Sequence, residues 1–413
     1  PCLCGLHRRR SRPWHLMPKA ESVQAARDAV VSRAPDPQGI VLQLGAAAGR
    51  VLSQELTTQV DLPPFASAAM DGYAALPTPA GTSLNVVGES RAGQPFNGAL
   101  SEGEAISIST GAVAPVGVGI APIEVVSVED QVVIPEVAIE GGRHVRLAGE
   151  DMPAGAVALA AGTELGPAQL QVAAACGVES VEVAAQPRVA IVATGDELAP
   201  AGSELEPGQI YESNGVGLSA LAVAIGCEVV STARCADDLG ATSKALDSAL
   251  ETADIVIASG GVSVGEHDHV RPALADLGVE EVFWRVPLKP GGPTWFGVGP
   301  SGQLVFGLPG NPASAYVTFC LFARPAIRAM LGLSPFVERW PAQTSEALPL
   351  RDREQAIRVS LSPRADAMPL ATPTGAQGSH RTASLAGAWG IAMLPPGDGN
   401  LAAGEVVEVE PLP

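Results

Sequence analysis

The sequence has 413 residues, of which 46% are apolar and 17% are charged. This length is typical of about two to four domains, and the apolar fraction supports a sizeable core and excludes a disordered chain. With 25 basic and 44 acidic residues the net charge is -19, which argues against nucleic-acid or anionic-membrane partners, because attraction to polyanions needs the opposite sign. The six cysteines are dispersed, so we expect no disulfide framework and a reduced, cytoplasmic protein.

The first sixteen residues differ from the rest of the chain. They are basic and have no apolar periodicity. A basic stretch can begin a targeting peptide, but no apolar segment follows it here. We therefore expect residues 1–16 to be non-native or unstructured and to have no role in the fold.

The next stretch predicts two helices and then a β-rich module. Apolar residues at helical spacing behind a possible Ser22 cap predict a helix over 21–33, and we expect a second helix over 44–56. Residues 78–160 contain short alternating runs separated by Gly and Pro, which predict an all-β module with hairpins. Helical character returns over 166–177, where Gly177 is a typical stop.

Strands and helices alternate from Pro187 onward. Apolar runs ending in glycines are followed by helical segments, a pattern typical of a parallel sheet covered on both faces. We expect residues 187–330 to form a doubly wound α/β domain. After Pro335 the strand patterns return and predict a small β-rich C-terminal domain.

Ligands of an open parallel sheet bind beyond the carboxyl ends of its strands. Four loops rich in glycine or proline lie at such ends, at 194–197, 259–268, 289–293 and 308–314. Glycine lets the backbone approach a ligand and present N–H groups to an anion, although a single glycine turn is also an ordinary strand–helix connection. Four such loops at one edge predict an anion site. The candidate substrate-binding residues in them are Thr194, Gly195, Asp196, Gly260, Gly261, Ser263, Gly265, Glu266, Pro309, Gly310, Asn311 and Pro312.

Three acids also follow predicted strands, namely Glu197, Asp238 and Asp268. Each one alone is better explained as a solvated surface acid in a chain of this charge. As a set beside anion-binding loops they favour Mg²⁺ bridging phosphate oxygens, with Asp238 and Asp268 as the candidate metal ligands.

Lys289 is one of only three lysines in the chain. Its place between a strand and a Pro-Gly turn indicates a need for a compact positive charge, and the alternative is chance retention.

Other catalytic patterns are not supported. His267 and His269 flank Asp268, but no further ligand run follows, so we expect no zinc site. The run 261–265 matches G-x-S-x-G, yet Ser263 lies several residues past the strand, where it suits an anion donor better than a nucleophile. The phosphate-binding sequence of P-loop NTPases does not occur.

Eight segments, in order and spread over almost the whole chain from Met17, resemble the molybdopterin molybdenumtransferases of molybdenum cofactor biosynthesis, the MoeA and gephyrin E-domain group. Two short motifs, TGDEL and GGVSVG, are shared with related pterin-binding adenylyltransferases. The segments are LPPFASAAMDGYA (62–74), RLAGEDMPAG (146–155), VAIVATGDEL (189–198), GQIYESN (208–214), SGGVSVGEHD (259–268), LKPGGP (288–293), LPGNPASA (308–315) and AQGSHRTASLAGAWG (376–390).

The resemblance implies a multidomain α/β plus β protein that acts as a homodimer with its site between subunits. It implies insertion of molybdate into adenylylated molybdopterin, with release of AMP in a Mg²⁺-dependent step. The implied domains are a MogA-like α/β domain (19–38 and 186–335), a linker and dimerisation domain (39–57 and 156–185), a β-rich insert (58–155) and a C-terminal β domain (336–413).

The resemblance also implies roles for individual residues. Arg285 and Lys289 match basic positions of the family. The oxyanion pocket for molybdate is implied at Ser314, Arg358 and Ser379, and Asp71 matches an acid that reaches the partner subunit's cleft. The implied catalytic residues are Asp71, Asp151, Glu197, Asp238, Asp268 and Lys289.

The sequence departs from the family pattern at three places. Gly292 stands where the family usually has lysine, Glu212 where it usually has aspartate, and residues 66–68 are Ala-Ser-Ala instead of Asp-Asn-Ser. Two alternatives follow. One is a divergent, non-catalytic paralogue that binds pterin intermediates. The other is a molybdopterin adenylyltransferase, which the additional β domains disfavour.

Overall fold

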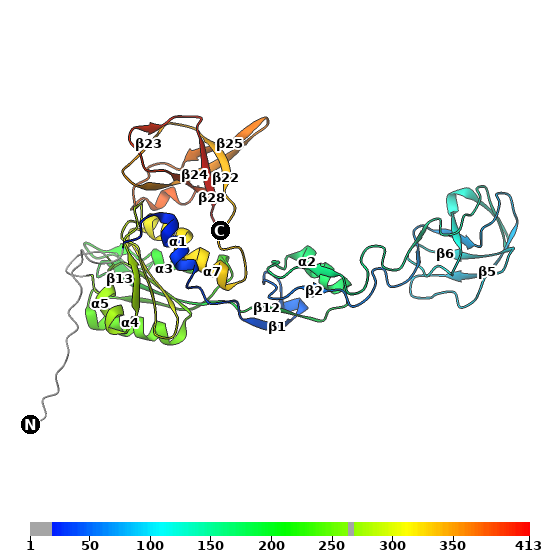
Figure 1. The fold of residues 1–413 in the computed structure, drawn as a ribbon, viewed down its shortest axis with the longest axis horizontal. Helices are drawn as coiled ribbons and strands as arrows, with labels where there is room; N and C mark the ends of the chain where they lie inside the picture. The colour runs from blue at the N-terminus through cyan, green and yellow to red at the C-terminus, as the bar shows by residue number, and fades with distance from the viewer. Residues whose placement is uncertain (1–18, 263–267) are drawn as a thin grey trace, which may run out of the picture. The chain divides into compact units, whose positions relative to one another are not determined.

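The computed structural model describes residues 19–262 and 268–413. Residues 1–16 lie outside this part, as do three predicted substrate-binding residues, Ser263, Gly265 and Glu266. The chain divides into two compact units, one of residues up to Ile40 with Ala184–Pro413 and one of Val41–Val183 (Figure 1). No helix within the described residues is long and apolar enough to cross a membrane.

The first expected helix is confirmed as α1 (Val23–Val31). The Ser22 hydroxyl accepts a hydrogen bond from the Ala25 N–H at 3.0 Å, which satisfies one of the free donors at the helix start. The prediction of a helix over 44–56 is wrong. Only a 3₁₀ turn forms there, because the chain turns at a left-handed Gly49 and its next residues pair with a distant segment.

The first unit contains a six-stranded sheet in the order β16-β13-β17-β21-β20-β18. The first four strands are parallel, which confirms the doubly wound α/β prediction. The last two are antiparallel additions that the alternating pattern does not predict. The strands are β13 (Arg188–Thr194), β16 (Glu228–Cys235), β17 (Ile255–Ser259), β18 (Glu280–Trp284), β20 (Trp295–Val298) and β21 (Leu304–Leu308). A short parallel pair, β14 (Leu198–Ala199) and β15 (Ile210–Tyr211), follows β13.

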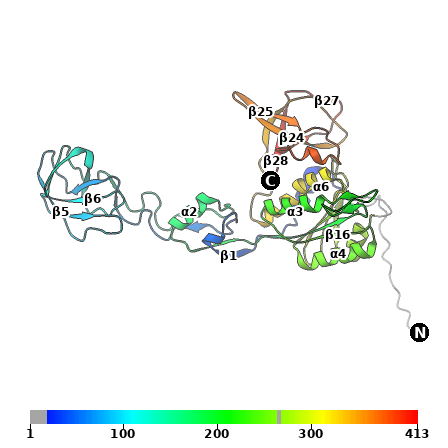
Figure 2. The same cartoon turned by 180° about the vertical axis from the view of Figure 1, so that it is seen from behind.

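Helices cover both faces of this sheet. Figure 1 and Figure 2 show α4 and α5 on one face and α3, α6 and α7 on the other. The α4 face carries a buried apolar cluster that includes Val192, Leu246 and Val256. The helices are α3 (Asn214–Ala224), α4 (Leu239–Thr252), α5 (Val270–Asp276), α6 (Pro312–Thr318) and α7 (Arg324–Met330), with a π-helical turn at Phe319–Ala323.

The C-terminal segment is β-rich, as predicted. Strand β24 pairs with both β25 and β26, so the order β24-β25-β22-β28-β26 closes into a small barrel. One strand of the α/β region, β19 (Leu288–Lys289), adds to this sheet beside β24. The strands are β22 (Trp340–Thr344), β24 (Glu354–Arg364), β25 (Ala367–Pro373), β26 (Gly390–Leu394) and β28 (Val406–Pro411), with a separate pair of β23 (Leu348–Pro349) and β27 (Asn400–Leu401).

A buried ion network fastens the barrel to the helices. The Glu410 carboxylate, fully buried on β28, contacts Arg27 of α1 at 2.8 Å, Arg324 of α7 at 2.5 Å and Arg339 at 3.2 Å. Burial alone would raise the pKa of Glu410, but the three guanidinium charges outweigh burial and hold this pKa below its usual value.

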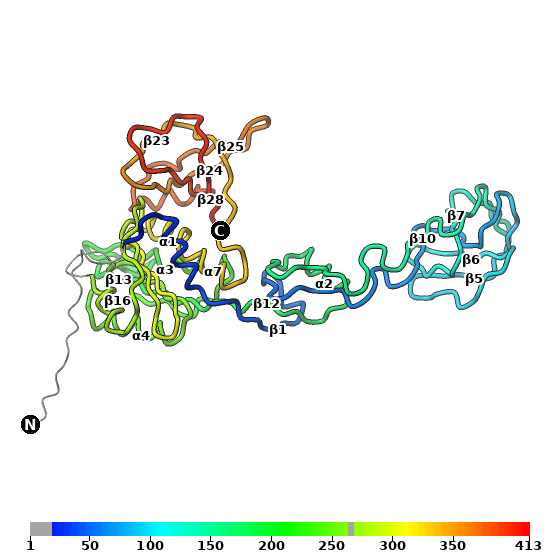
Figure 3. The backbone as a smooth tube through the Cα atoms, in the orientation of Figure 1, coloured from blue at the N-terminus to red at the C-terminus, as the bar shows by residue number. Residues whose placement is uncertain are grey.

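The second unit combines a β-rich part with one short helix, α2 (Pro167–Ala175) (Figure 3). Its main sheet has the order β7-β4-β6-β5-β9-β8, in agreement with the strand patterns of residues 78–160. Those strands are β4 (Gly72–Ala75), β5 (Leu84–Ser90), β6 (Glu104–Ile108), β7 (Gly119–Pro122), β8 (Val126–Glu129) and β9 (Val132–Pro135). Smaller pairs are β3 (Ser67–Ala68) with β10 (Val145–Arg146), β2 (Leu56–Thr57) with β11 (Val157–Leu159), and β1 (Gly39–Gln43) with β12 (Ser180–Ala184).

Candidate functional site

The carboxyl ends of the parallel strands surround a cavity of about 70 Å³, which we call the strand-end cavity. Four predicted residues line it, Thr194 and Glu197 from the loop after β13 and Gly310 and Pro312 from the loop after β21. Glu212 lines it too, with its Oε1 accepting a hydrogen bond from the Gly215 N–H at 2.6 Å. Loops that are more than 100 residues apart in sequence therefore meet at the edge where ligand binding is expected.

Close packing explains the glycines of these loops. Gly260 has a φ of +93°, and a Cβ there would lie 2.6 Å from the Thr194 carbonyl oxygen. A Cβ on Gly310 would lie 3.5 Å from the Gly260 Cα. The loops after β13, β17 and β21 are thus packed backbone to backbone, and a side chain at 260 would push them apart.

The Thr194 hydroxyl is an orphan polar group in this cavity. The residue is 7% exposed, and its Oγ1 has no hydrogen-bond partner within the described residues. A buried hydroxyl without a partner costs about 1–3 kcal/mol. This group is therefore available to a ligand that enters the cavity.

Asn214 is a functional candidate that the sequence analysis did not select. Its Nδ2 donates to the Ser259 hydroxyl at 2.8 Å and to the Gly310 carbonyl at 2.7 Å. It thereby ties the start of α3 to two strand-end loops. The signal for it was present, because Asn214 ends the GQIYESN segment.

A second junction joins the α/β loops to the barrel. The Asn311 Nδ2 donates to the Ser379 hydroxyl at 3.1 Å, and the Ala313 N–H donates to the Ser379 carbonyl at 3.1 Å. Predicted substrate-binding residues of the α/β domain are therefore in direct contact with a predicted oxyanion residue of the C-terminal domain.

Arg358 lies in the barrel behind this junction. It is completely buried, and burial lowers its pKa to about 10. Its Nε donates to the Ser384 hydroxyl at 2.9 Å, and its Nη2 donates to the Gly378 carbonyl at 3.3 Å. Its Nη1 has no partner among the residues that the structure describes. Gln377 holds its backbone, accepting from the Arg358 N–H at 2.9 Å.

A cavity of about 330 Å³, which we call the barrel cavity, lies between the Lys289 loop and the C-terminal barrel. Its lining includes the charged residues Lys289, Arg351 and Glu346. It also includes Gln377 and Gly378, which belong to the loop that binds Arg358. Two cations and one carboxylate therefore face this space, which gives it a net positive charge in a strongly acidic chain.

The predicted metal ligand Asp238 and the predicted substrate-binding residue Asp196 have local structural roles as well. Asp238 caps α4, with its Oδ1 accepting from the Ala241 N–H at 2.8 Å, and Asp196 accepts from the Asp237 N–H at 3.1 Å. Asp268 is half-buried just before α5. The described residues contain no group of three or more His, Cys, Asp or Glu side chains that could hold a metal ion.

The predicted residues that line neither cavity include Arg285, Ser314, Asp71 and Asp151. Arg285 stacks on its neighbour Trp284, 4.4 Å from the ring centre, and Ser314 is buried within α6. Asp71 and Asp151 belong to the second unit, so their roles stay predictions. Hydrogen bonds from the N–H and hydroxyl of Thr110 lower the pKa of Asp71.

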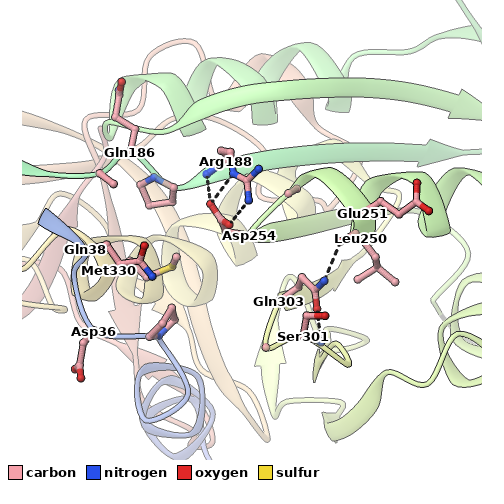
Figure 4. Close-up of a pocket in the computed structure, with 15 residues that line it drawn as sticks. Asp36, Gln38, Gln186, Arg188, Leu250, Glu251, Asp254, Ser301, Gln303 and Met330 are labelled. Carbon is pink, nitrogen blue, oxygen red and sulfur yellow. Dashed lines mark hydrogen bonds and ion pairs between the residues drawn. The ribbon is translucent and has the colours of Figure 1, made fainter. Parts of the chain in front are cut away.

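A cavity of about 490 Å³, larger than the strand-end and barrel cavities, lies at the opposite edge, where the parallel strands begin (Figure 4). It contains none of the predicted site residues. Several of its polar groups are already paired. Arg188 contacts Asp254 at 2.8 Å, and the Gln303 Nε2 donates to the Leu250 carbonyl at 2.8 Å (Figure 4).

Comparison with known proteins identifies the class and then the family. Residues 190–329 match the family described as a probable molybdopterin binding domain, so the α/β domain is of the molybdopterin-binding class. The remainder matches the MoeA N-terminal region (domain I and II) over residues 21–177 and the MoeA C-terminal region (domain IV) over residues 341–412. The chain belongs to the MoeA family of molybdopterin molybdenumtransferases.

Full-length relatives agree with this assignment. The molybdopterin molybdenumtransferase of Haemophilus influenzae is 32% identical over 405 residues, 94% of this chain and 98% of the relative. Molybdopterin molybdenumtransferase 2 of Mycobacterium tuberculosis is 36% identical over 389 residues, 90% and 94% of the two chains. The crystal structure of a molybdopterin biosynthesis MoeA protein from Pyrococcus horikoshii has a TM-score of 0.82 and 29% identity, covering 95% of this chain and 99% of that one.

Proposed function

We propose that this chain inserts molybdate into adenylylated molybdopterin and releases AMP. The observation that carries the proposal is the junction between Asn311 and Ser379, hydrogen-bonded at 3.1 Å. It joins the strand-end loops, which suit a phosphate group, to the barrel segment that holds Arg358. A phosphorylated substrate and an oxyanion would thus bind next to each other, as the reaction requires.

The strand-end cavity is assigned to the phosphate end of the substrate. The orphan hydroxyl of Thr194 and the N–H groups of the glycine loops would donate to phosphate oxygens. Asn214 would keep the loops after β17 and β21 in register with the start of α3. Close glycine packing leaves little room for water, which strengthens these hydrogen bonds.

The barrel cavity is assigned to molybdate, with Lys289 and the loop around Arg358 and Ser379 as its donors. Tetrahedral dianions are stabilised by fixed cations and N–H or O–H donors in a partly shielded site. In the proposed reaction two dithiolene thiols bond to molybdenum, their protons and one molybdate oxygen leave as water, and water cleaves the phosphoanhydride bond to AMP. The chain's own residues position the partners and neutralise charge.

Mg²⁺ is proposed as the metal ion, with Asp238 and Asp268 as its protein ligands. Carboxylate oxygens suit this ion, which normally keeps several waters and uses one or two carboxylates together with substrate phosphate. The capping bond of Asp238 uses its Oδ1, so the other oxygen is the one proposed for the metal. Bound Mg²⁺ would supply neutralisation of phosphate charge.

We further propose a cytoplasmic homodimer in which Asp71 of one subunit completes the site of the other. Thr110 fixes the exposed Asp71 carboxylate through bonds of 2.6 and 2.9 Å, so the charged group is already oriented. The net charge of -19 argues against nucleic-acid or anionic-membrane partners.

The alternatives are weaker on specific grounds. An adenylyltransferase would not need the regions that match the two MoeA families outside the α/β domain. A non-catalytic paralogue is motivated by Gly292, where the family usually has lysine. A Cβ at this position would lie 3.4 Å from the Leu288 carbonyl oxygen, which is ordinary contact, so Gly292→Lys is sterically possible. For a paralogue impaired at this position, that variant should raise molybdate affinity sharply.

The proposal is tested by AMP release. Purified chain is mixed with adenylylated molybdopterin, and molybdate and Mg²⁺ are added together or singly. We expect AMP to be released only when both are present. A folded chain that releases no AMP, while another MoeA-family enzyme does so in parallel, would contradict the proposal.

A further inference from the structure

We propose that Arg351 is an anion-binding residue of the barrel cavity, which it shares with Lys289, and that it favours a doubly charged tetrahedral oxyanion. This inference rests on the proposed function, because it names a residue that would hold the molybdate. No sequence motif and no family position used above points to Arg351.

The first support is geometric. Arg351 and Lys289 line the same cavity of about 330 Å³. Gln355 brings them together, since its backbone is the register partner of Lys289 and its Nε2 donates to the Pro349 carbonyl at 2.8 Å, two residues before Arg351. The turn itself is fixed, because the Arg351 carbonyl accepts from the Gly397 N–H at 2.7 Å.

The second support is the lack of a partner. Within the described part of the chain, the Arg351 guanidinium has no hydrogen bond or ion pair, and neither has the Lys289 amine. The nearby Arg353 is different, because it forms a two-point pair with Asp352 at 2.8 and 2.7 Å. The pKa of Asp352 is lowered mainly by Arg353 and also by the charge of Lys289, which places Lys289 near this turn.

The third support is chemical. A guanidinium presents N–H groups in a planar fork that can contact two oxygens of one tetrahedral anion, whereas lysine supplies a point charge. Glu346 also lines the cavity and repels anions. With Arg351 the cavity carries two positive charges against this carboxylate. Without it the single positive charge of Lys289 is balanced by this carboxylate, which does not favour a dianion.

The test measures molybdate binding to the full chain by isothermal titration calorimetry at fixed ionic strength. We expect Arg351→Ala and Arg351→Gln each to raise the Kd for molybdate about ten- to a hundredfold, the range for a hydrogen bond to a charged group. Arg351→Lys should fall between these variants and the unmodified chain, because it keeps the charge and loses the fork. The KM for molybdate in AMP release should rise in parallel, with little change in the KM for the adenylylated substrate.

Arg364→Ala is the matched control. It removes one positive charge from the same barrel, and Arg364 does not line the cavity. Wild-type affinity in Arg351→Ala and Arg351→Gln would overturn this inference while leaving the proposed function standing. An equal loss in Arg364→Ala would also overturn it, because the effect would then be one of net charge. If the unmodified chain neither binds molybdate nor releases AMP, the proposed function fails and this inference fails with it.

Discussion

Arg27 and Arg358 are both buried in the first unit, with 2% and 0% of their surfaces exposed, but only one of them faces a carboxylate. Arg27 contacts both oxygens of Glu410, at 2.8 and 3.3 Å. Arg358 donates only to neutral oxygens, those of Ser384, Ala376 and Gly378. The first region is a joint whose arginines share a buried counterion, and the second is a buried cation without a counterion among the described residues.

The difference indicates which buried charges serve stability and which serve binding. Burying a cation is costly unless an anion accompanies it. Glu410 supplies that anion for Arg27, so the protein itself provides the counterion of this joint. For Arg358 no carboxylate partner exists among the described residues, whereas each of the two arginines has one buried nitrogen without a partner there, Nε of Arg27 and Nη1 of Arg358. We infer that a bound anion completes this second region.

The largest expected effect is on the joint. Glu410→Gln leaves Arg27, Arg324 and Arg339 without their shared counterion, and breaking a buried ion pair in this way typically costs about 3–5 kcal/mol. We expect this loss in the free energy of unfolding measured by denaturant titration. Glu408→Gln, on the exposed face of the same strand, is the control and should change stability little. An equal change in both variants would contradict a joint built on Glu410.

The joint also predicts a pH dependence. Because the pKa of Glu410 is lowered in the folded protein, its contribution to stability is present above the unfolded pKa, about 4.3, and is lost as the pH falls through the folded value. The unmodified chain should therefore lose stability below about pH 4 more steeply than Glu410→Gln. Parallel stability curves for the two proteins between pH 5 and pH 3 would refute this linkage.

The next effect concerns the uncompensated cation. Molybdate at about 100 times its Kd should stabilise the unmodified chain by about 2.7 kcal/mol, since a ligand that binds only the folded state shifts unfolding by mass action. In Arg358→Met this gain should disappear, while folding is retained because Met fills much of the same space. Thermal unfolding with and without molybdate measures both values. The control is Arg381→Met, which replaces an exposed arginine close to Gln377 and Gly378 in sequence and should keep the full gain in stability. If the gain persisted in Arg358→Met, Arg358 would not belong to the anion site.

A smaller effect is expected at Thr194, where loss of the hydroxyl should weaken substrate binding without lowering the stability of the unliganded protein. Thr194→Val should raise the KM for the adenylylated substrate about fivefold, because one hydrogen bond worth about 1 kcal/mol is lost. The unliganded protein should be equally stable or slightly more so, because the hydroxyl is buried without a partner. Thr232→Val, at an exposed position of the adjacent strand, is the control for kinetics and for urea unfolding. A drop in stability with unchanged KM would show that Thr194 serves the fold.

Local patterns predicted most of the fold. The α/β alternation, the Ser22 cap and the C-terminal strands follow from periodicity and capping chemistry, which depend on neighbouring residues. The helix expected over 44–56 fails because the Leu52 N–H pairs with the Thr163 carbonyl at 2.9 Å, a contact more than 100 residues away in sequence. Nothing in that segment alone encodes its partner.

The candidate site likewise has residues that the sequence predicts and residues whose importance depends on distant contacts. The sequence could predict the strand-end residues Thr194, Glu197 and Gly310, because parallel strands end at one edge of a sheet. Asn214 and Arg351 were not selected, because their importance depends on contacts that only the folded chain reveals. Arg358 was selected by resemblance alone, and its missing counterion could not be deduced from sequence.

The smallest effect is expected at the amino edge of the sheet, where the cavity of about 490 Å³ lies (Figure 4). Arg188 and Asp254 form an ion pair there at 2.8 Å, with side chains 50% and 36% exposed. Arg188→Ala should cost less than about 1 kcal/mol, and this cost should shrink further in high salt because the pair is screened. AMP release and molybdate affinity should not change, because Arg188 and Asp254 are paired with each other within the protein, in contrast to Arg358. A different outcome would be a tenfold fall in AMP release by Arg188→Ala with normal folding by circular dichroism. It would show that cavity size predicts the functional site here better than the contrast between paired and unpaired groups does.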